Sequence, residues 1–418
     1  MRFISVFILA FSLFTSHSSY AETYYVDDID SQRGSGTIGD PFRFLQQAID
    51  YASDFDTLII AEGEYTAIPS PFTENLCGNC EMHRTEVKAS TGFSIRNTPL
   101  TLIGAGMDKT VLITNAGYGL YIENSTPTLL TGMTVTGGIR DADGAATDAG
   151  IVARRSRVTI TQCAVKGNTH RDTSVVVGIG GIFGREGSEL FVIDNLIEDN
   201  GWDGIALYRG ATAYISDNII HKGRGVGIGV TWDAAAIVQR NRISGYWKGI
   251  GSFGDTRVVA RENEVFDNLG WGIIATGTSW MDAHDNIVAR NGNCGMAVWG
   301  SDCEGRFTNN IVIDNGWRKE WVCPCVGIWA YAEDSLKQIE LRLSDFEISY
   351  NNVWNNKAGD YQDLPDLTGI YGNVSTKPEF SNPADSTDFR LKPDSRLKDI
   401  GNPRITDDDG TASDIGPG

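Results

Sequence analysis

The chain has 418 residues, with 35 Lys and Arg against 54 Asp and Glu, so its formal net charge is −19 and its pI is about 4.7. This balance argues against nucleic acid as a partner, because a phosphate-binding surface needs clustered basic residues. An anionic ligand would need a local basic patch or a bound cation on this acidic chain.

The first residues predict an export signal. Arg2 precedes the apolar run 4–14, and Ser19-Tyr20-Ala21 offers the small residues that a signal peptidase reads. The run is too short to span a bilayer, and no later segment is long and apolar enough for a transmembrane helix. We expect residues 1–21 to be a signal peptide and the mature chain to be a periplasmic or secreted monomer. A retained interfacial anchor is the alternative.

Residues 22–89 predict an N-terminal cap with a Cys-containing insertion. Residues 24–27 have the sequence Tyr-Tyr-Val-Asp and predict a strand. Asp40 is the expected N-cap of a helix and Pro41 its first residue. The apolar face of that helix would cover the open end of a stack of strands; it contains Leu45, Ala48, Ile49 and Ala52.

The seven cysteines predict disulfides, as is typical of an exported chain. Cys77 and Cys80 predict a small disulfide loop; the alternative is a zinc site that also uses His83 and Glu81. Four cysteines around one long insertion are expected to hold it in place through disulfide bonds; they are Cys294, Cys303, Cys323 and Cys325. Cys163 is left over and is expected to be a buried thiol.

A repeat of about 23 residues determines the expected fold. Its first marker is a Gly-Ile or Gly-Met step, at residues 150, 181, 204, 227, 249, 272, 295 and 327. Its second marker is an Asn, at residues 195, 218, 241, 263, 286 and 310, with Cys163 in the same place one coil earlier. Between the markers apolar and polar residues alternate with the period of strands. Each Asn is expected in a tight turn, hydrogen-bonded to the Asn of the next coil.

The aliphatic residue two places after each Asn is expected to point inward and to stack. This file contains Ile197, Ile220, Ile243, Val265, Val288 and Val312. Each such burial contributes roughly 1.5–3 kcal/mol. A single coil would not be stable alone, but a stack of coils buries a continuous core and is stable.

These markers resemble the repeat of the pectin-lyase-like proteins, in which each coil has three short strands and a ladder of turn Asn residues. The resemblance covers about residues 90–360 and implies an all-β fold, a right-handed parallel β-helix. Residues 361–418 lose the repeat and are expected to form a C-terminal cap. Asp407-Asp408-Asp409-Gly410 in that cap is a candidate calcium site, with a solvated acidic turn as the alternative.

In the family that the chain resembles, substrate lies on the outer face of the strand that begins at the Gly-Ile step. The outward residues expected at the fourth position of each step are Arg154, Arg185, Tyr208, Thr231, Phe253, Thr276, Trp299 and Tyr331. Adjacent positions and turns add Arg155, Trp202, Asp203, Arg209, His221, Lys222, Arg224, Trp232, Trp247, Lys248, Trp271, Trp317 and Trp329.

Two features of this face indicate a ligand. The first is a basic stripe over the earlier coils, which contains Arg154, Arg155, Arg185, Arg209, Lys222, Arg224 and Lys248. Stacked cations about 4.8 Å apart repel each other, so the stripe favours an anion lying across it. The alternative is pairing with nearby carboxylates. The second feature is the row of outward aromatic rings, a stacking surface for sugars unless a loop folds over it.

Catalysis on an acidic polysaccharide by a lyase would need a base and cations that hold the developing charge. The candidate catalytic residues are Asp203, Arg209, His221, Lys222 and Arg224. The candidate substrate-binding residues are Arg154, Arg185, Tyr208, Trp232, Phe253, Trp299, Trp329 and Tyr331. Asp203, Asp233 and Asp255 are candidates for a calcium site or for a hydrolytic carboxylate pair.

None of these residues matches a catalytic signature of the family. Residues 281–285, with the sequence Met-Asp-Ala-His-Asp, faintly resemble the Asp-Pro-His-Asp segment of alginate epimerases. His284, however, is expected on the second strand of its coil, away from the substrate face. A secreted lyase that acts on an acidic polysaccharide is therefore the first hypothesis. A glycoside hydrolase, a uronate epimerase, a non-catalytic glycan-binding or cell-surface protein and a structural solenoid are the alternatives. The sequence identifies no specific cofactor, and calcium is the candidate ion.

Overall fold

The computed structural model describes residues 21–28, 34–78, 82–170, 176–319, 323–331, 345–406 and 410–417. The expected signal peptide up to residue 20, Cys80, Glu81 and residues 407–409 lie outside these ranges. The signal peptide, the small disulfide loop, the zinc alternative and the calcium turn therefore stay predictions. No helix among the described residues is long and apolar enough to cross a membrane.

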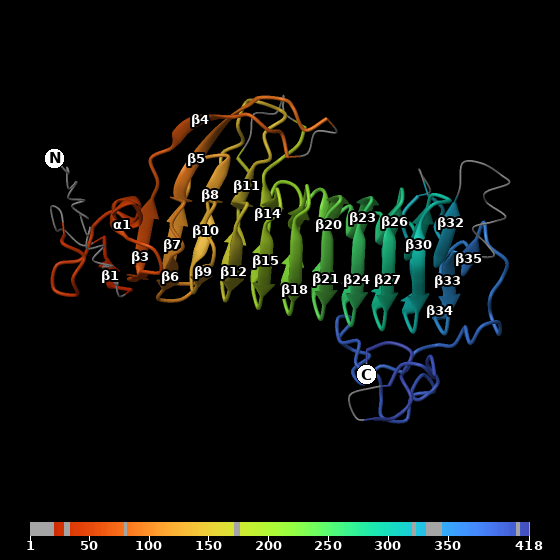
Figure 1. Ribbon diagram of the computed structural model, residues 1–418. Coiled ribbons are helices and arrows are strands. Elements are labelled where there is room, and N and C mark those ends of the chain that lie inside the picture. Colours follow the sequence, from red (N-terminus) through yellow and green to blue (C-terminus); the bar gives the residue numbers. More distant parts are fainter. Residues whose placement is uncertain are drawn as a thin grey trace, which may run out of the picture.

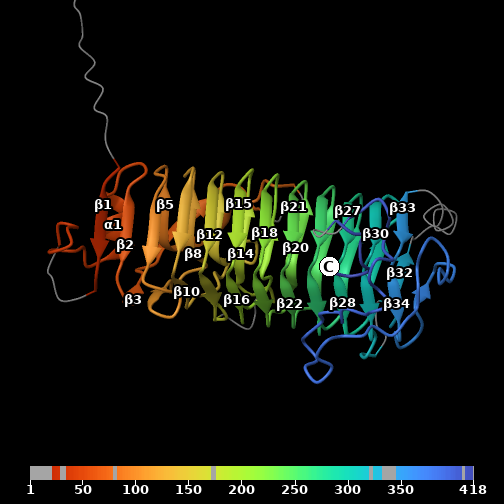
Figure 2. The same ribbon diagram turned by 90° about the horizontal axis from the view of Figure 1, so that it is seen from below.

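The chain forms a parallel β-helix with three long sheets (Figures 1 and 2). Sheet 1 contains β1 (Thr23–Val26), β2 (Thr57–Ile60), β6 (Thr101–Gly104), β9 (Thr128–Thr131), β12 (Arg157–Thr161), β15 (Glu189–Ile193), β18 (Thr212–Ser216), β21 (Ala235–Gln239), β24 (Arg257–Arg261), β27 (Trp280–His284), β30 (Glu304–Thr308) and β33 (Phe346–Ser349). Sheet 2 contains β3 (Gly63–Thr66), β7 (Thr110–Ile113), β10 (Thr134–Thr136), β13 (Ala164–Lys166), β16 (Leu196–Glu198), β19 (Ile219–His221), β22 (Arg242–Ser244), β25 (Glu264–Phe266), β28 (Ile287–Ala289), β31 (Ile311–Ile313) and β34 (Asn352–Trp354).

Sheet 3 holds the strands that begin near the Gly-Ile steps. It contains β4 (Ser70–Glu74), β5 (Val87–Arg96), β8 (Tyr118–Glu123), β11 (Ala149–Arg154), β14 (Gly180–Arg185), β17 (Ile205–Leu207), β20 (Val226–Trp232), β23 (Lys248–Gly254), β26 (Trp271–Thr276), β29 (Met296–Trp299), β32 (Ile328–Tyr331) and β35 (Tyr361–Gln362). Its outer face carries the outward residues expected from the repeat.

The register of the repeat is confirmed. Residues that follow the Gly of each step pair as neighbours in parallel strands, in the order Ile151, Ile182, Ile205, Ile228, Ile250, Ile273, Met296 and Ile328. The inward file from Ile197 to Val312 is also confirmed, because its members pair in register in sheet 2 and are fully buried.

The expected Asn ladder is present and longer than the sequence suggested. The Nδ2 of Asn218 donates to the Oδ1 of Asn241 at 2.9 Å, and the ladder continues through Asn351 to Asn373. Cys163 does take the place of the Asn one coil earlier, since its backbone N–H donates to Asn195 Oδ1.

A second ladder was missed. It runs through Asn268, Asn291, Asn315 and Asn356 at the turn before sheet 3. Each of these four Asn residues lies five places after an Asn of the first ladder, as in 286 and 291, so this spacing was a readable signal.

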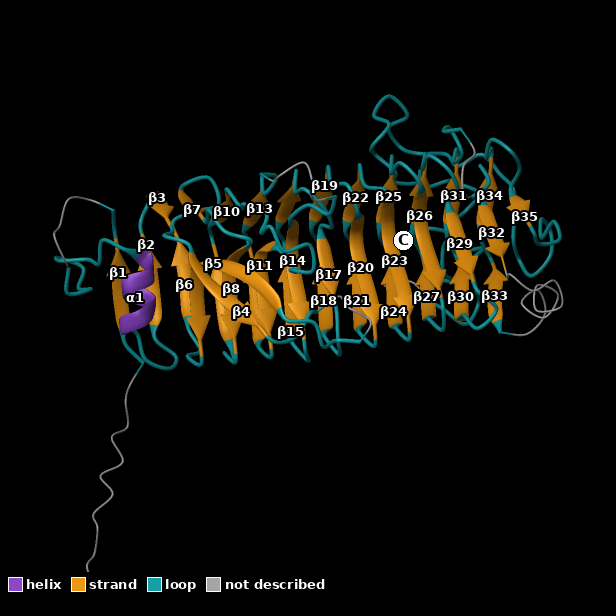
Figure 3. Cartoon of the chain, turned by 90° about the horizontal axis from the view of Figure 1, so that it is seen from above, coloured by secondary structure: helices purple, strands orange, loops and turns teal. Residues whose placement is uncertain are grey.

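The N-terminal helix is shorter than expected. Helix α1 spans Leu45–Tyr51 and follows Phe44, so the expected N-cap at Asp40 and the first turn at Pro41 are wrong. Asp40 instead accepts the backbone N–H of Ser35 in a turn. The expected apolar face is correct, because Leu45, Ala48 and Ile49 are buried at the end of the stack near β1 (Figure 3).

Two further segments lie differently from the expected caps. Strands β2 and β3 already stack on β6 and β7, so the coils begin before residue 90. At the other end, Phe389, Leu397 and Ile415 pack against Phe266 and Ile311 of sheet 2. The C-terminal segment thus lies along the side of the β-helix (Figure 1).

The expected disulfides of the long insertion are not present. Cys294, Cys303, Cys323 and Cys325 are free, buried thiols, and so is Cys163, as expected. Cys303 cannot join the others because its sulfur contacts the carbonyl of Gly277, in the turn after β26, while Cys294 interacts with Cys323 in the turn before sheet 3.

Candidate functional site

Two arginines of the basic stripe, Arg154 and Arg185, are buried and paired with carboxylates of the chain. Arg154 and Arg185 pair in register on neighbouring strands, as expected. Glu74 of β4 lies 3.0 Å from both guanidinium groups, and Glu186 lies 3.0 Å from Arg154 and 3.1 Å from Arg185. The anion that lies across these arginines is therefore supplied by the chain itself. Arg155 likewise pairs with Glu123 at 2.6 Å.

The antiparallel hairpin β4–β5 covers the outer face of sheet 3 at these coils (Figure 1). A second apolar core forms beneath it; the core includes Tyr118, Tyr121, Phe183, Ala206 and Tyr208. Tyr208, a candidate substrate-binding residue, is 8% exposed. Arg154, Arg185 and Tyr208 therefore pack under the hairpin in this structure, although the sequence analysis had placed them on an open face.

The candidate catalytic cations are divided between two edges of sheet 3. His221 and Lys222 both contact Glu198, at 3.1 and 3.0 Å, at the side of sheet 2. Arg224 is exposed in the turn before β20, whereas Arg209 lies in the turn after β17. A strand such as Val226–Trp232 is about 20 Å long, so the structure does not bring these residues together.

The three candidate aspartates are also separated. Asp203 precedes β17, while Asp233 and Asp255 follow β20 and β23 and are exposed. Asp233 accepts the backbone N–H of Gly210 at 2.7 Å. Within the described ranges, no group of three or more His, Cys, Asp or Glu side chains is arranged to hold a metal ion.

The aromatic row is present on the later coils of sheet 3. We call it the aromatic face; it consists of Trp247, Phe253, Trp271, Trp299, Trp329 and Tyr331. Neighbouring rings are in contact, with centroid distances of 5.8 Å for Trp247 and Trp271, 6.2 Å for Trp271 and Trp299, and 5.6 Å for Trp299 and Trp329. Trp271 and Trp329 are buried, and the other four rings are partly exposed.

Lys248 is the cation that the structure places on this face. Its Nζ lies 5.3 Å from the ring centroids of both Phe253 and Trp271, in the range of cation–π contacts. Burial lowers the pKa of Lys248, and the charge of Asp203 partly opposes that shift. The sequence analysis had assigned Lys248 only to the basic stripe.

Asp203 is directed toward the coil of Lys248. Its Oδ1 accepts the backbone N–H of Val226 at 2.7 Å, and Val226 is the register partner of Lys248. Burial raises the pKa of Asp203 to about 6, although the Val226 N–H and Lys248 act in the opposite direction. A carboxyl group and an amine with opposite shifts therefore share one part of the sheet 3 face, which is typical of functional sites.

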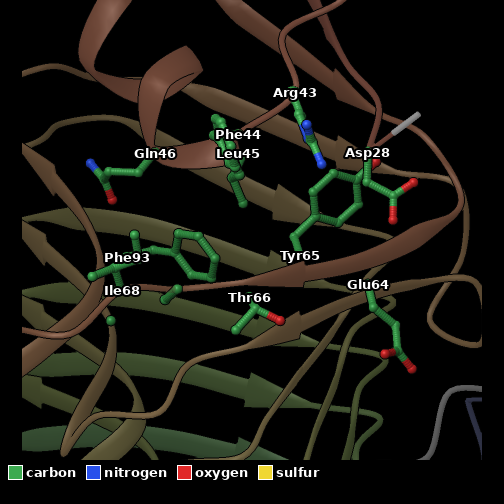
Figure 4. Close-up of a pocket in the computed structure, with 12 residues that line it drawn as sticks. Asp28, Arg43, Phe44, Leu45, Gln46, Glu64, Tyr65, Thr66, Ile68 and Phe93 are labelled. Atoms are coloured by element: carbon green, nitrogen blue, oxygen red, sulfur yellow. The ribbon is translucent and has the colours of Figure 1, made fainter. Parts of the chain in front are cut away.

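A hollow of about 430 Å³ lies far from this face, between α1, β3 and β5. Arg43 points into it beside Asp28 and Tyr65 (Figure 4). The hydroxyl of Tyr65 donates to the carbonyls of Val26 and Ala61, so that ring is held in place by the backbone. The hollow shares no residue with the aromatic face.

The comparison with known protein families agrees with the β-helix fold described above. The profile of right-handed β-helix regions matches residues 72–231 and 180–346, which together are more than half of the chain.

The chain belongs to the right-handed β-helix family.

Several solved structures resemble this β-helix. They include the A-module of the mannuronan C-5 epimerase AlgE4 from Azotobacter vinelandii, with 15% identity, a TM-score of 0.43 and coverage of 80% of this chain and 95% of that one. The pectate lyase Pel9A has 14% identity, a TM-score of 0.42 and coverage of 95% and 96%. A mannuronic acid-specific family 6 lyase from the human gut microbiota has 12% identity, a TM-score of 0.39 and coverage of 84% of both chains. At these identities the likeness concerns the fold alone. The sequence itself matches no curated protein.

Proposed function

We propose that this β-helix protein cleaves an acidic polysaccharide by β-elimination on the outer face of sheet 3, with Lys248 as the base. The observation that carries the proposal is the position of the Lys248 amine, held over two aromatic rings in the coil next to Val226, whose N–H binds Asp203. Sequence reasoning alone had left the base unassigned between residues that the fold separates.

The environment of Lys248 suits proton abstraction. A base must be uncharged before it takes a proton, and burial among Phe253 and Trp271 disfavours the ammonium form. The neighbouring Asp203 carboxylate would stabilise the ammonium that forms after the transfer, since opposite charges in a dry site attract strongly. The pair therefore favours the charge that develops during the reaction.

The aromatic face suits a sugar chain. The apolar C–H faces of sugar rings stack on aromatic side chains, and this face presents four partly exposed rings in contact with two buried ones. Arg318 lies beside it, with its guanidinium 4.8 Å from the ring of Trp247. This guanidinium would bind a sugar carboxylate on an otherwise acidic protein.

The proposed reaction is a β-elimination. The Lys248 amine takes the proton on the carbon next to the sugar carboxylate, and the electron pair of that C–H bond forms a carbon–carbon double bond. The glycosidic C–O bond on the adjacent carbon breaks, and its oxygen leaves with a proton from solvent or from protonated Asp203. The products are a chain with a new reducing end and a chain that begins with an unsaturated sugar.

The test is to incubate the purified protein with alginate, pectate and glycosaminoglycans, with and without calcium, and to follow the absorbance of the unsaturated product. The Lys248→Met variant keeps the length of the side chain and should lose about 10²- to 10⁴-fold in rate. The matched control is Lys222→Met, which removes a lysine paired with Glu198 and should keep full activity. Full activity of Lys248→Met, or no unsaturated product with any polymer, would refute the proposal.

Glycan binding without turnover is the second candidate, because the aromatic face would serve it equally well. A protein that binds an acidic oligosaccharide through Trp299 but releases no product would support this reading. Return of the proton to the opposite face of the same carbon would instead make the protein an epimerase. Deuterium incorporation from heavy water without a new double bond distinguishes that outcome.

A further inference from the structure

The outer face of sheet 3 is covered over its first strands, whereas over its later strands it is partly exposed at the fourth position of each Gly-Ile step. Tyr118, Tyr121 and Phe183 are between 0% and 4% exposed because they pack with Val87 and Ala89 of the hairpin strand β5. At the fourth position of the Gly-Ile step, Arg154, Arg185 and Tyr208 of the earlier coils are buried, whereas Phe253, Trp299 and Tyr331 of the later coils are partly exposed. Figure 1 shows the hairpin standing over only one half of the β-helix.

The boundary between the two parts falls between β17 and β20. Tyr208 at the end of β17 is buried, whereas Thr231 and Trp232 at the end of β20 are partly exposed. Trp232 packs against the core beneath the hairpin. The guanidinium of Arg209 lies 4.5 Å from the centroid of the Trp232 ring. The stacked pair of Arg209 and Trp232 therefore stands where the open face ends.

The turn that follows each sheet 3 strand changes one strand further along. Its left-handed position is occupied by large side chains after β11, β14, β17 and β20, namely Arg155, Glu186, Arg209 and Trp232, with φ between 44° and 64°. After β23, β26 and β29 the same position is occupied by Gly254, Gly277 and Gly300. A large ring at positive φ is uncommon because its Cβ is strained there. Trp232 is thus held at an unfavourable backbone position at the very edge of the open face.

We infer that the proposed polysaccharide site is blind-ended, so that it accepts the end of a chain and releases short products stepwise. This inference rests on the proposed function. A polymer that follows the aromatic face crosses the strands from β32 to β20, about 19 Å at the usual strand spacing. It cannot continue past β17, because the hairpin β4–β5 occupies that face.

The terminal sugar would then meet Arg209 and Trp232. The indole ring offers a stacking surface, and the guanidinium of Arg209 suits a carboxylate on the last sugar. Lys248 pairs with Val226 at the start of β20, whereas Trp232 lies at the end of that strand, about 20 Å further along it. Cleavage at Lys248 of a chain whose end is held at Arg209 and Trp232 would therefore release a short product of a few sugar units.

The experiment follows the size of the products over time, with the polymer that the protein cleaves. We expect one short unsaturated product from the earliest time points, while the viscosity of the polymer falls slowly. A ladder of intermediate sizes and a rapid loss of viscosity would overturn the blind-ended site but leave the proposed function standing. No unsaturated product with any polymer would overturn both.

The matched variants are Trp232→Ala and Trp280→Ala. Trp280 is stacked with Arg257 at 4.8 Å on sheet 1, so its loss removes the same kind of contact away from the site. We expect Trp232→Ala to raise the KM for short oligosaccharides about threefold to thirtyfold, as loss of a stacking contact should. Trp280→Ala should leave it unchanged. Equal KM values for Trp232→Ala and the unaltered protein, with both variants folded by circular dichroism, would contradict terminal recognition.

Discussion

The carboxylate of Asp203 accepts the backbone N–H of Val226 at 2.7 Å and so lies against the next coil, buried on the face that also carries Lys248. This contact does not fully compensate burial, because the pKa of Asp203 is raised from 3.8 to about 6. The site therefore has a cost in stability at neutral pH, a common trade-off at functional positions.

That cost predicts a pH-dependent difference in stability. The folded state binds the Asp203 proton more tightly than the unfolded state, so this group favours folding below about pH 4, and that contribution is lost as the pH rises through about 6. The total is about 3 kcal/mol. Asp203→Asn removes this titration, so the variant should be more stable than the unaltered protein at pH 7 and similar at pH 4. Urea unfolding at several pH values measures it; parallel stability curves for the two proteins would contradict it.

The buried ion cluster of the hairpin predicts a large loss of stability for Arg185→Met. Arg185 is fully buried, and its loss leaves the carboxylates of Glu74 and Glu186 to share the guanidinium of Arg154 beneath the hairpin. We expect the free energy of unfolding to fall by about 3–5 kcal/mol. Arg157→Met is the control, because its pair with Glu189 is exposed and worth less than about 1 kcal/mol. Similar losses in the two variants, measured by denaturant unfolding, would speak against a structural role of the cluster.

The aromatic face predicts that Trp299 contributes to binding. Trp299 is partly exposed and touches Trp271, Trp329 and Tyr331, so its replacement by Ala removes the middle of the face. We expect the Kd for an acidic oligosaccharide to increase about fivefold to tenfold, the loss of one aromatic contact. Isothermal titration calorimetry measures the change, with Trp280→Ala as the control. An unchanged Kd for Trp299→Ala would show that the aromatic face is not the binding surface.

The packing of Tyr246 against Gly223 predicts opposite effects of two substitutions. A Cβ at Gly223 would lie 1.9 Å from Tyr246 Cε1, so Gly223→Ala should lower the free energy of unfolding by about 1–3 kcal/mol. The buried hydroxyl of Tyr246 has no hydrogen-bond partner in the described part of the chain, so Tyr246→Phe should be neutral or stabilising by about 1 kcal/mol. Gly144→Ala is the control, because no atom lies within 4 Å of its added Cβ. A thermal unfolding series ranks the three variants, and a destabilised Tyr246→Phe would indicate a partner for the hydroxyl.

The same pair of residues explains why the second ladder was hard to see in the sequence. Gly223 and Tyr246 occupy the turn positions that Asn200 and Asn268 occupy in nearby coils, and the Tyr246 ring fills the space left by the missing side chain. The ladder is therefore interrupted at the coils of the candidate site. The first ladder has no such interruption from Asn195 to Asn310, and this part of it could be predicted, whereas its continuation to Asn351 and Asn373 was not.

The stack of coils, the register of the Gly-Ile strands and the inward aliphatic file can all be derived from the amino-acid sequence alone. These features repeat every 23 residues or so, and a periodic pattern specifies which neighbours meet once the strands are parallel. Which outward residues are exposed depends instead on contacts between segments that are distant in the sequence. Glu74 lies 111 residues before Arg185, outside any repeat, and its approach turns an apparent anion-binding stripe into a buried ion cluster. No local pattern encodes that contact, because it depends on how the non-repeating hairpin folds back over the repeating face.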